Sequence, residues 1–328
     1  MESQDGPGFF LLRLPLMRTF LRAHWKVIVA IVLPVLLATM TVNPGAAVPE
    51  LPLAARLRAH VSATASSEHN IATPAERERA ARYIEGVLES EGYTIRRQAY
   101  RAGGQVVHDI EVSVANVAPD TRPARIFIVG AHYDNNSGTA AVLELSRLLK
   151  DMRPSQGTEV RFVFFVNEEQ PWFKGEEIGS TQSTADAPVL ETIGWYTLQR
   201  HGGQRQPGVE KRYPDAGGFI AFVGTQASSR LVQDALSAFR AVSDFPAHGL
   251  AAPAYVQGVT LSDHSAYHRS GYPAILIADT GFMRYPYYKM KADDGTEEPP
   301  DKFDYEGTAR VLRGLARTIR ALAAGQQG

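Results

Sequence analysis

Residues 126–144 of the chain read IFIVGAHYDNNSGTAAVLE, and this stretch decides the fold. It begins with a continuous apolar run, Ile126–Ala131, which is typical of a strand that is buried on both faces of a sheet. The polar residues His132 and Asp134 follow that run directly. Apolar residues then return at helical spacing from Ala141 onward, which predicts a helix. A buried strand that leads into a helix is the repeating unit of a parallel α/β sheet.

The same alternation continues along the chain. Three further apolar runs predict buried strands, namely Val160–Val166, Phe219–Val223 and Ala274–Ala278. One helix is expected to start at a capping box at Thr73 and to stop at Gly92, and the last helix is expected near Glu306–Ala323. We therefore predict an α/β fold, a doubly wound, mostly parallel central sheet with helices on both faces.

Composition narrows the chemistry that the chain can perform. Its 328 residues contain no cysteine, which excludes disulfides, thiolate metal sites and a cysteine nucleophile. The formal net charge is −1, with 34 Lys and Arg against 35 Asp and Glu. This balance argues against a nucleic-acid partner, which would require a basic face.

The N-terminal residues look like an export signal. The run Val27–Val42 carries no charge, and basic residues precede it, namely Arg13, Arg18, Arg22 and Lys26. The run is shorter than the roughly 20 residues of a membrane span, so a cleaved signal peptide and an uncleaved anchor both stay open. We predict that residues 1–48 form the signal peptide or membrane anchor and that residues 49–328 form one domain. The positive-inside rule then puts that domain outside the cytoplasm, in the periplasm, in the extracellular space or anchored to the membrane.

Polar residues follow three of the apolar segments, where ligands bind in sheets of this kind. They are His132 with Asp134, Glu168 with Glu169, and Glu191. An imidazole and several carboxylates at one edge favour a divalent cation; zinc suits this mixture of ligands, while manganese or cobalt would fit less well. We assign Glu168 as the general base that takes a proton from the attacking water and Glu169 as a metal ligand. Taken singly, the glutamate pair could be a charged turn, and His132 could be an ordinary core histidine.

Several motifs in order resemble the zinc-dependent aminopeptidases of peptidase family M28. They are residues 129–144, 165–169 with 175–180, 190–196, 262–265, 271–274 and 300–306, so that the resemblance spans roughly Ala55 to Ala323. The resemblance implies a doubly wound α/β fold that holds two zinc ions bridged by one aspartate. It also implies that His132 and Glu191 bind one ion, that Glu169 binds the other and that Glu168 is the base. By the same resemblance Asp263 and His264 lie near the substrate.

The chain departs from the family pattern in three places. The loop that separates two aspartates in the family is missing, so Asp134 stands in both positions. Lys289 occupies the place where the family usually has its last histidine ligand, and the stretch Ser180–Glu191 is short. A single-metal site therefore stays open, as does a substitute ligand at His264 or His268.

A substrate role is considered for the residues around Lys289. A desolvated Lys289 could replace the charge of the second metal and hold the substrate carbonyl. Aromatic residues nearby, Tyr288 among them, could line a pocket or donate a hydrogen bond, although ordinary loop packing explains them equally well.

The predicted function is an exported metallo-aminopeptidase that removes N-terminal residues from peptides with a free N-terminus, using one or two zinc ions. One alternative is an acyltransferase that resembles glutaminyl cyclases and binds one zinc ion. Another is a degenerate, non-catalytic module that binds peptide or metal. A serine hydrolase is disfavoured because Ser262, Asp263 and His264 are adjacent in sequence, which is the wrong layout for a triad.

Overall fold

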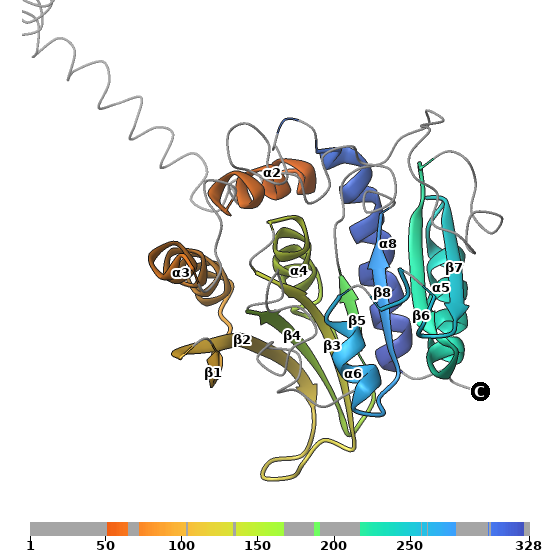
Figure 1. The fold of residues 1–328 in the computed structure, drawn as a ribbon, viewed down its shortest axis with the longest axis horizontal. Helices are drawn as coiled ribbons and strands as arrows, with labels where there is room; N and C mark the ends of the chain where they lie inside the picture. Colours follow the sequence, from red (N-terminus) through yellow and green to blue (C-terminus); the bar gives the residue numbers. More distant parts are fainter. Residues whose placement is uncertain are drawn as a thin grey trace, which may run out of the picture. The chain divides into compact units, whose positions relative to one another are not determined.

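The protein is described from a computed structural model (Figure 1). The structure describes residues 51–64, 72–102, 104–133, 136–166, 187–190, 217–256, 258–260, 262–279, 301 and 303–324. The chain divides into two units, Met1–Leu51 and Pro52–Gly328, and the helices and strands that the structure describes belong to the second.

The second unit alternates strands and helices. Its strands are β1 (Arg96–Ala102), β2 (Gln105–Asn116), β3 (Arg125–His132), β4 (Thr158–Phe165), β5 (Ala187–Leu190), β6 (Ile220–Thr225), β7 (Ala247–Ala252) and β8 (Ala274–Ala278). Its helices are α2 (Leu53–Thr64), α3 (Pro74–Ser90), α4 (Asn136–Leu148), α5 (Ser229–Val242), α6 (His264–Arg269) and α8 (Tyr305–Ala324), and a short 3₁₀ turn, η2 (Gln226–Ser228), precedes α5.

The strands form one sheet in the order β1-β2-β4-β3-β5-β8-β6-β7. Its four central strands, β4, β3, β5 and β8, are parallel to one another. The antiparallel pairings lie outside them, between β1 and β2, β2 and β4, and β6 and β8. The mostly parallel α/β fold is therefore confirmed.

The apolar runs found in the sequence are strands β3, β4, β6 and β8, each within two residues of its expected bounds. Helix α3 begins at Pro74, but the Thr73 side chain makes no capping hydrogen bond, so the expected capping box is wrong. The other end of α3 behaves as expected. Gly92 has a positive φ of 78°, and the amides of Gly92 and Tyr93 donate to the carbonyls of Glu89 and Leu88, which is a Schellman closure.

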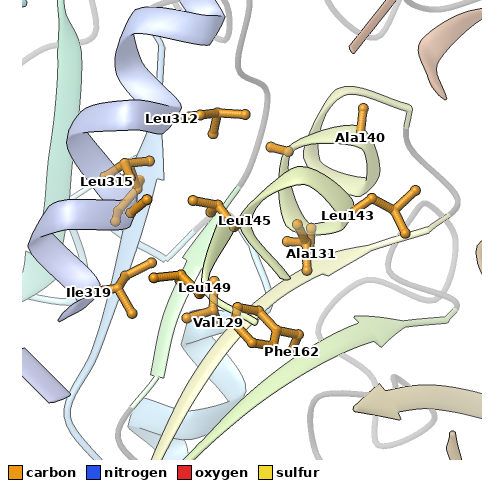
Figure 2. Close-up of a cluster of buried hydrophobic side chains, with 14 of the residues drawn as sticks. Val129, Ala131, Ala140, Leu143, Leu145, Leu149, Phe162, Leu312, Leu315 and Ile319 are labelled. Carbon is orange, nitrogen blue, oxygen red and sulfur yellow. The ribbon is translucent and has the colours of Figure 1, made fainter. Parts of the chain in front are cut away.

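The two faces of the sheet are covered differently. Helices α2, α3, α4, α5 and α8 contribute to the main core on one face (Figure 1). Figure 2 shows the centre of that core, which contains Leu145 of α4, Leu315 of α8 and Val129 of β3. Leu149, which directly follows α4, belongs to the same core. The short helix α6 packs on the opposite face through Tyr267, which joins a cluster with Ile128, Val163, Phe165 and Ala274.

A buried ionic network joins α2 to α4. Glu144 of α4 is fully buried and accepts hydrogen bonds from Arg56 Nε, Arg147 Nε and His60 Nε2, each at 2.8 Å. The Tyr83 hydroxyl contacts the other ring nitrogen of His60 at 2.8 Å. Burial alone would raise the pKa of Glu144, but the hydrogen bonds from His60 and Arg147 outweigh it and leave that pKa lowered. The network holds α4, the helix that follows His132, against the N-terminal helix of the domain.

The membrane prediction concerns Val27–Val42, which lies outside the described residues. Within the described ranges, no helix is both long enough and apolar enough to cross a membrane.

Candidate active site

The strands that precede the predicted site residues lie side by side. Strand β3 is between β4 and β5, and all three are parallel, so their carboxyl ends meet at one edge of the sheet. His132 ends β3 and is the register partner of Phe165, which ends β4. Strand β5 ends at Leu190, directly before Glu191. The three polar segments therefore follow, in the sequence, the ends of three adjacent parallel strands.

The ends of β3 and β4 are bonded to each other beyond the regular ladder. The amide of Tyr133 donates to the carbonyl of Phe165 at 2.7 Å. The Tyr133 ring is 2% exposed, and its hydroxyl donates to the carbonyl of His108 in β2 at 3.2 Å. The residues that directly precede the predicted metal and base residues are therefore held in place by these hydrogen bonds.

His132 is 1% exposed and lies on the α6 side of the sheet. Residues at alternate positions of a strand share a face, so His132 and Ile128, four residues earlier, point to the same side of the sheet. Ile128 belongs to the cluster around Tyr267 of α6. The Thr139 hydroxyl donates to the His132 carbonyl at 3.2 Å, which attaches the first turn of α4 to the end of β3. Only residues 133–135 connect β3 to α4, so the short connection inferred from the sequence is confirmed.

Two predicted substrate residues, Asp263 and His264, lie at the start of α6 and are fully buried. His264 Nε2 lies 2.7 Å from the Val259 carbonyl, so this nitrogen must carry the proton that it donates. Tyr267, one turn further along α6, packs against Phe165 with ring centroids 6.2 Å apart. These contacts bring α6 over the end of β4.

The two histidines considered as substitute ligands already make protein contacts. His268 Nδ1 lies 3.1 Å from the Thr225 hydroxyl, and His264 Nε2 is bonded to the Val259 carbonyl. A ligand role for either side chain would require its other ring nitrogen.

Sequence reasoning missed one residue of this region, Asp109 of β2. Because β2 runs antiparallel to β4, the N-terminal part of β2 lies at the carboxyl end of β4. Asp109 is 1% exposed, and its Oδ1 accepts the amide of Val166 at 3.1 Å. Burial and the negative charges of Asp263 and Glu111 raise the pKa of Asp109 well above its ordinary value, although the hydrogen bond from Val166 acts in the opposite direction. Its sequence neighbours His108 and Glu111 are polar as well, so no local pattern singled Asp109 out.

The remaining predicted site residues lie outside the described residues. They are Asp134, Glu168, Glu169, Glu191, Tyr288 and Lys289. Among the side chains that the structure describes, no three histidine or acidic groups lie close enough together to hold a metal ion. The described part of the site is its frame, made of the strand ends, His132, Asp109 and the start of α6.

Comparison with known proteins identifies the family. Residues 113–305 match Peptidase family M28. The chain is 32% identical over 264 residues to the Uncharacterized protein YfbL of Escherichia coli (strain K12), a match that covers 72% of this chain and 78% of that protein.

Solved structures share the fold at low sequence identity. An aminopeptidase from Aneurinibacillus sp. strain AM-1 superposes with a TM-score of 0.59 at 14% identity, covering 82% of this chain and 93% of that chain. A Bacteroides thetaiotaomicron glutaminyl cyclase superposes with a TM-score of 0.55 at 14% identity, covering 84% and 98%. Together with the family match over residues 113–305, the motifs and the arrangement of the strand ends lead to one conclusion: the chain belongs to peptidase family M28.

Proposed function

We propose that the protein is an exported metallo-aminopeptidase that hydrolyses the first peptide bond of peptides with a free N-terminus. The observation that carries this proposal is the bonded pair of strand ends, in which the amide of Tyr133 donates to the carbonyl of Phe165 at 2.7 Å. Asp134 directly follows Tyr133, and Glu168 is three residues beyond Phe165. The segments that carry the metal ligands and the base therefore leave the sheet from adjoining points.

The residues at this edge suit zinc. A buried imidazole, His132, ends one strand, and carboxylates follow it and the two neighbouring strands, which is the mixed nitrogen and oxygen donor set that zinc takes in hydrolases. His132, Asp134, Glu169 and Glu191 would hold one or two ions. Zinc bound there would polarise the scissile carbonyl and lower the pKa of a bound water from about 15.7 towards 7.

The residues of the chain supply the proton transfers and the binding contacts. Glu168 would accept a proton from the attacking water and deliver it to the amine that leaves. Asp263 and His264, which lie over the end of β4, would contact the N-terminal part of the substrate. Tyr288 and Lys289 would contact the substrate as well, with the Lys289 ammonium placed to attract a carbonyl oxygen.

Turnover and metal content of the purified protein test the proposal together. Protein supplied with zinc should release leucine from a leucyl chromogenic amide. Glu168→Gln should lower kcat by about 10²- to 10⁴-fold while the bound zinc, measured by mass spectrometry, stays the same. Glu89→Gln, an exposed change on α3, is the matched control and should leave both unchanged. Full activity of Glu168→Gln would refute the assignment of the base.

A second candidate is a cyclase that acts on N-terminal glutamine with one zinc ion. It is favoured by the glutaminyl cyclase from Bacteroides thetaiotaomicron among the structures that share the fold. Incubation with a glutaminyl peptide separates the two, because cyclisation releases ammonia whereas hydrolysis releases free glutamine. Failure of both reactions in protein that binds zinc would favour a non-catalytic binding module.

We further propose that Val27–Val42 directs the domain out of the cytoplasm, as a cleaved signal or as an anchor. N-terminal sequencing of the full chain after expression in cells distinguishes them, because cleavage yields a new N-terminus near residue 48. Recovery of the full-length, uncleaved chain in the soluble cytoplasmic fraction after cell fractionation would refute the export.

A further inference from the structure

Asp109 contacts the chain at the point where it leaves the sheet towards the proposed base. Its neighbour in β2, Ile110, is the register partner of Phe164 in β4, so Asp109 lies level with the last residue of that strand. Val166, the first residue after β4, donates its amide to Asp109 Oδ1 at 3.1 Å. Glu168 follows two residues later.

A second side chain holds the other polar group of Val166. The Tyr100 hydroxyl of β1 donates to the Val166 carbonyl at 3.0 Å. Val166 itself is fully buried, so neither its amide nor its carbonyl could turn to bulk water without cost. Side chains from β1 and β2 therefore replace the backbone hydrogen bonds of the sheet at the point where β4 ends.

The setting of Asp109 shows that this contact is not a casual surface hydrogen bond. The side chain is 1% exposed, and within the described residues its Oδ2 has no hydrogen-bond partner. Buried polar atoms in that condition are uncommon and require an explanation. Burial and the nearby charges of Asp263 and Glu111 raise the pKa of Asp109 above its ordinary value, although the hydrogen bond from Val166 acts in the opposite direction. The side-chain amide of asparagine has the same shape as this carboxyl group and keeps an oxygen that can accept the Val166 amide.

We propose that Asp109 is a positioning residue, which fixes the Val166 amide through Oδ1 and thereby holds the following residues, Glu168 and Glu169, in the geometry that turnover requires. This inference rests on the proposed function. It assigns Asp109 no contact with substrate or metal. What Asp109 supplies is an acceptor of fixed direction at the end of β4, and its charge plays no part.

Three variants of the full-length protein separate positioning from general stability. Asp109→Asn keeps the acceptor and removes the ionisable group. Asp109→Leu removes the hydrogen-bond acceptor with a side chain of similar size. If the leucine variant fails to fold, Asp109→Ala is used in its place. Val112→Ala is the matched control, because Val112 is fully buried in the same strand but belongs to the core on the other face of the sheet.

Kinetics on the leucyl amide and hydrogen exchange at Val166 give the two measurements. Asp109→Leu should lose about 10- to 100-fold in kcat with KM within about twofold of wild type, since a displacement of about 1 Å in a catalytic group has an effect of this size. Asp109→Asn should restore most of kcat. The Val166 amide should exchange faster in Asp109→Leu than in wild type or Asp109→Asn, while Val112→Ala should lower the unfolding midpoint and keep kcat.

Any other result with the Asp109 variants contradicts a specific part of the proposal. If Asp109→Leu keeps wild-type kcat, or loses no more than Val112→Ala at equal thermal stability, Asp109 has no positioning role. If the wild-type protein turns over no peptide, the proposed function fails. The hydrogen-exchange rates of the Val166 amide then test separately whether Asp109 fixes that amide. Equal protection of that amide in Asp109→Leu and in wild type would refute it.

Discussion

Gly130 of β3 is the position where one added methyl group should disturb the proposed site most directly. A Cβ at this residue would lie 2.5 Å from Cε2 and 2.9 Å from Cζ of Phe165, and 3.0 Å from the carbonyl oxygen of Val163. Phe165 is fully buried, and its ring packs against Tyr267 of α6 at 6.2 Å. The ring therefore has no open space to enter, and the end of β4 or helix α6 must move.

The size of the effect follows from that geometry. Forcing an extra methyl into a close-packed site costs about 1–3 kcal/mol. For a domain of this size, about 2–4 °C of melting temperature accompany each kcal/mol, so Gly130→Ala should melt roughly 2–12 °C lower. Because Phe165 immediately precedes the Val166 segment, a displacement of about 1 Å would carry Glu168 with it and lower kcat by about 100-fold.

Thermal unfolding by circular dichroism and kinetics on the leucyl amide test this expectation. Gly86→Ala is the matched control, since Gly86 lies on an exposed position of α3 with no atom within 4 Å of an added Cβ. That change should stabilise the protein by about 0.5–1 kcal/mol, because alanine is the better helix former. The double variant Gly130→Ala with Phe165→Leu should regain part of the lost stability. A Gly130→Ala protein as stable and as active as wild type would refute the close packing of Gly130 against Phe165.

Three further changes have expected outcomes of their own. Glu144→Gln should destabilise the protein by about 3 kcal/mol in urea unfolding at pH 7, since it removes a fully buried carboxylate that pairs with the half-buried Arg56 and Arg147. The folded-state pKa of Glu144 lies below its ordinary value of 4.5, so the stability difference between wild type and Glu144→Gln should be fully present above about pH 4.5. It should shrink as the pH falls through the lowered folded-state pKa, and a pH-independent difference would contradict this expectation. Leu145→Ala, in the core of Figure 2, should cost about 2–5 kcal/mol with kcat unchanged in the folded protein, and a loss below 1 kcal/mol would count against the packing. Dialysis against a chelator should abolish leucyl-amide hydrolysis and zinc should restore it, whereas activity that survives complete removal of the metal would sink the metallo-enzyme proposal.

The hydrophobic pattern was sufficient to predict four strands of the sheet, β3, β4, β6 and β8, but not β1 and β2 at its edge. Strands β3, β4, β6 and β8 are buried along most of both faces, so each appears in the sequence as a mainly apolar run, which in β4 is interrupted by Arg161. Strands β1 and β2 have a different composition because one face carries charged side chains. There Arg96 pairs with Glu111 and with Glu159, the latter at 2.8 Å. That polar face breaks the apolar signal, and both strands were missed for this reason.

The same cause explains which residues sequence reasoning could propose for the site. His132 was proposed because it ends an apolar run, and ligands bind at this end of the strands in parallel sheets. Asp109 was missed because it belongs to one of the unrecognised strands, and its place beside Val166 depends on the antiparallel pairing of β2 with β4. Pairing between strands distant in sequence depends on packing of the whole sheet, so no local pattern announces it.

The short connection between β3 and α4 limits the number of ways in which a metal can be held. Helix α4 starts at Asn136, and the Thr139 hydroxyl bonds back to the His132 carbonyl at 3.2 Å, so the backbone at both ends of residues 133–135 is fixed. Asp134 is the only carboxylate in that connection. The family pattern that the sequence resembles has two aspartates there, one to bridge two ions and one to orient the histidine. In the proposed site, a second ion would therefore draw its ligands from outside this connection, for which Glu169 and residues beyond β8 are the candidates. The number of zinc ions bound per chain is thus a direct measure of whether the C-terminal segment, with Lys289 in the place of a histidine, still completes a two-metal site.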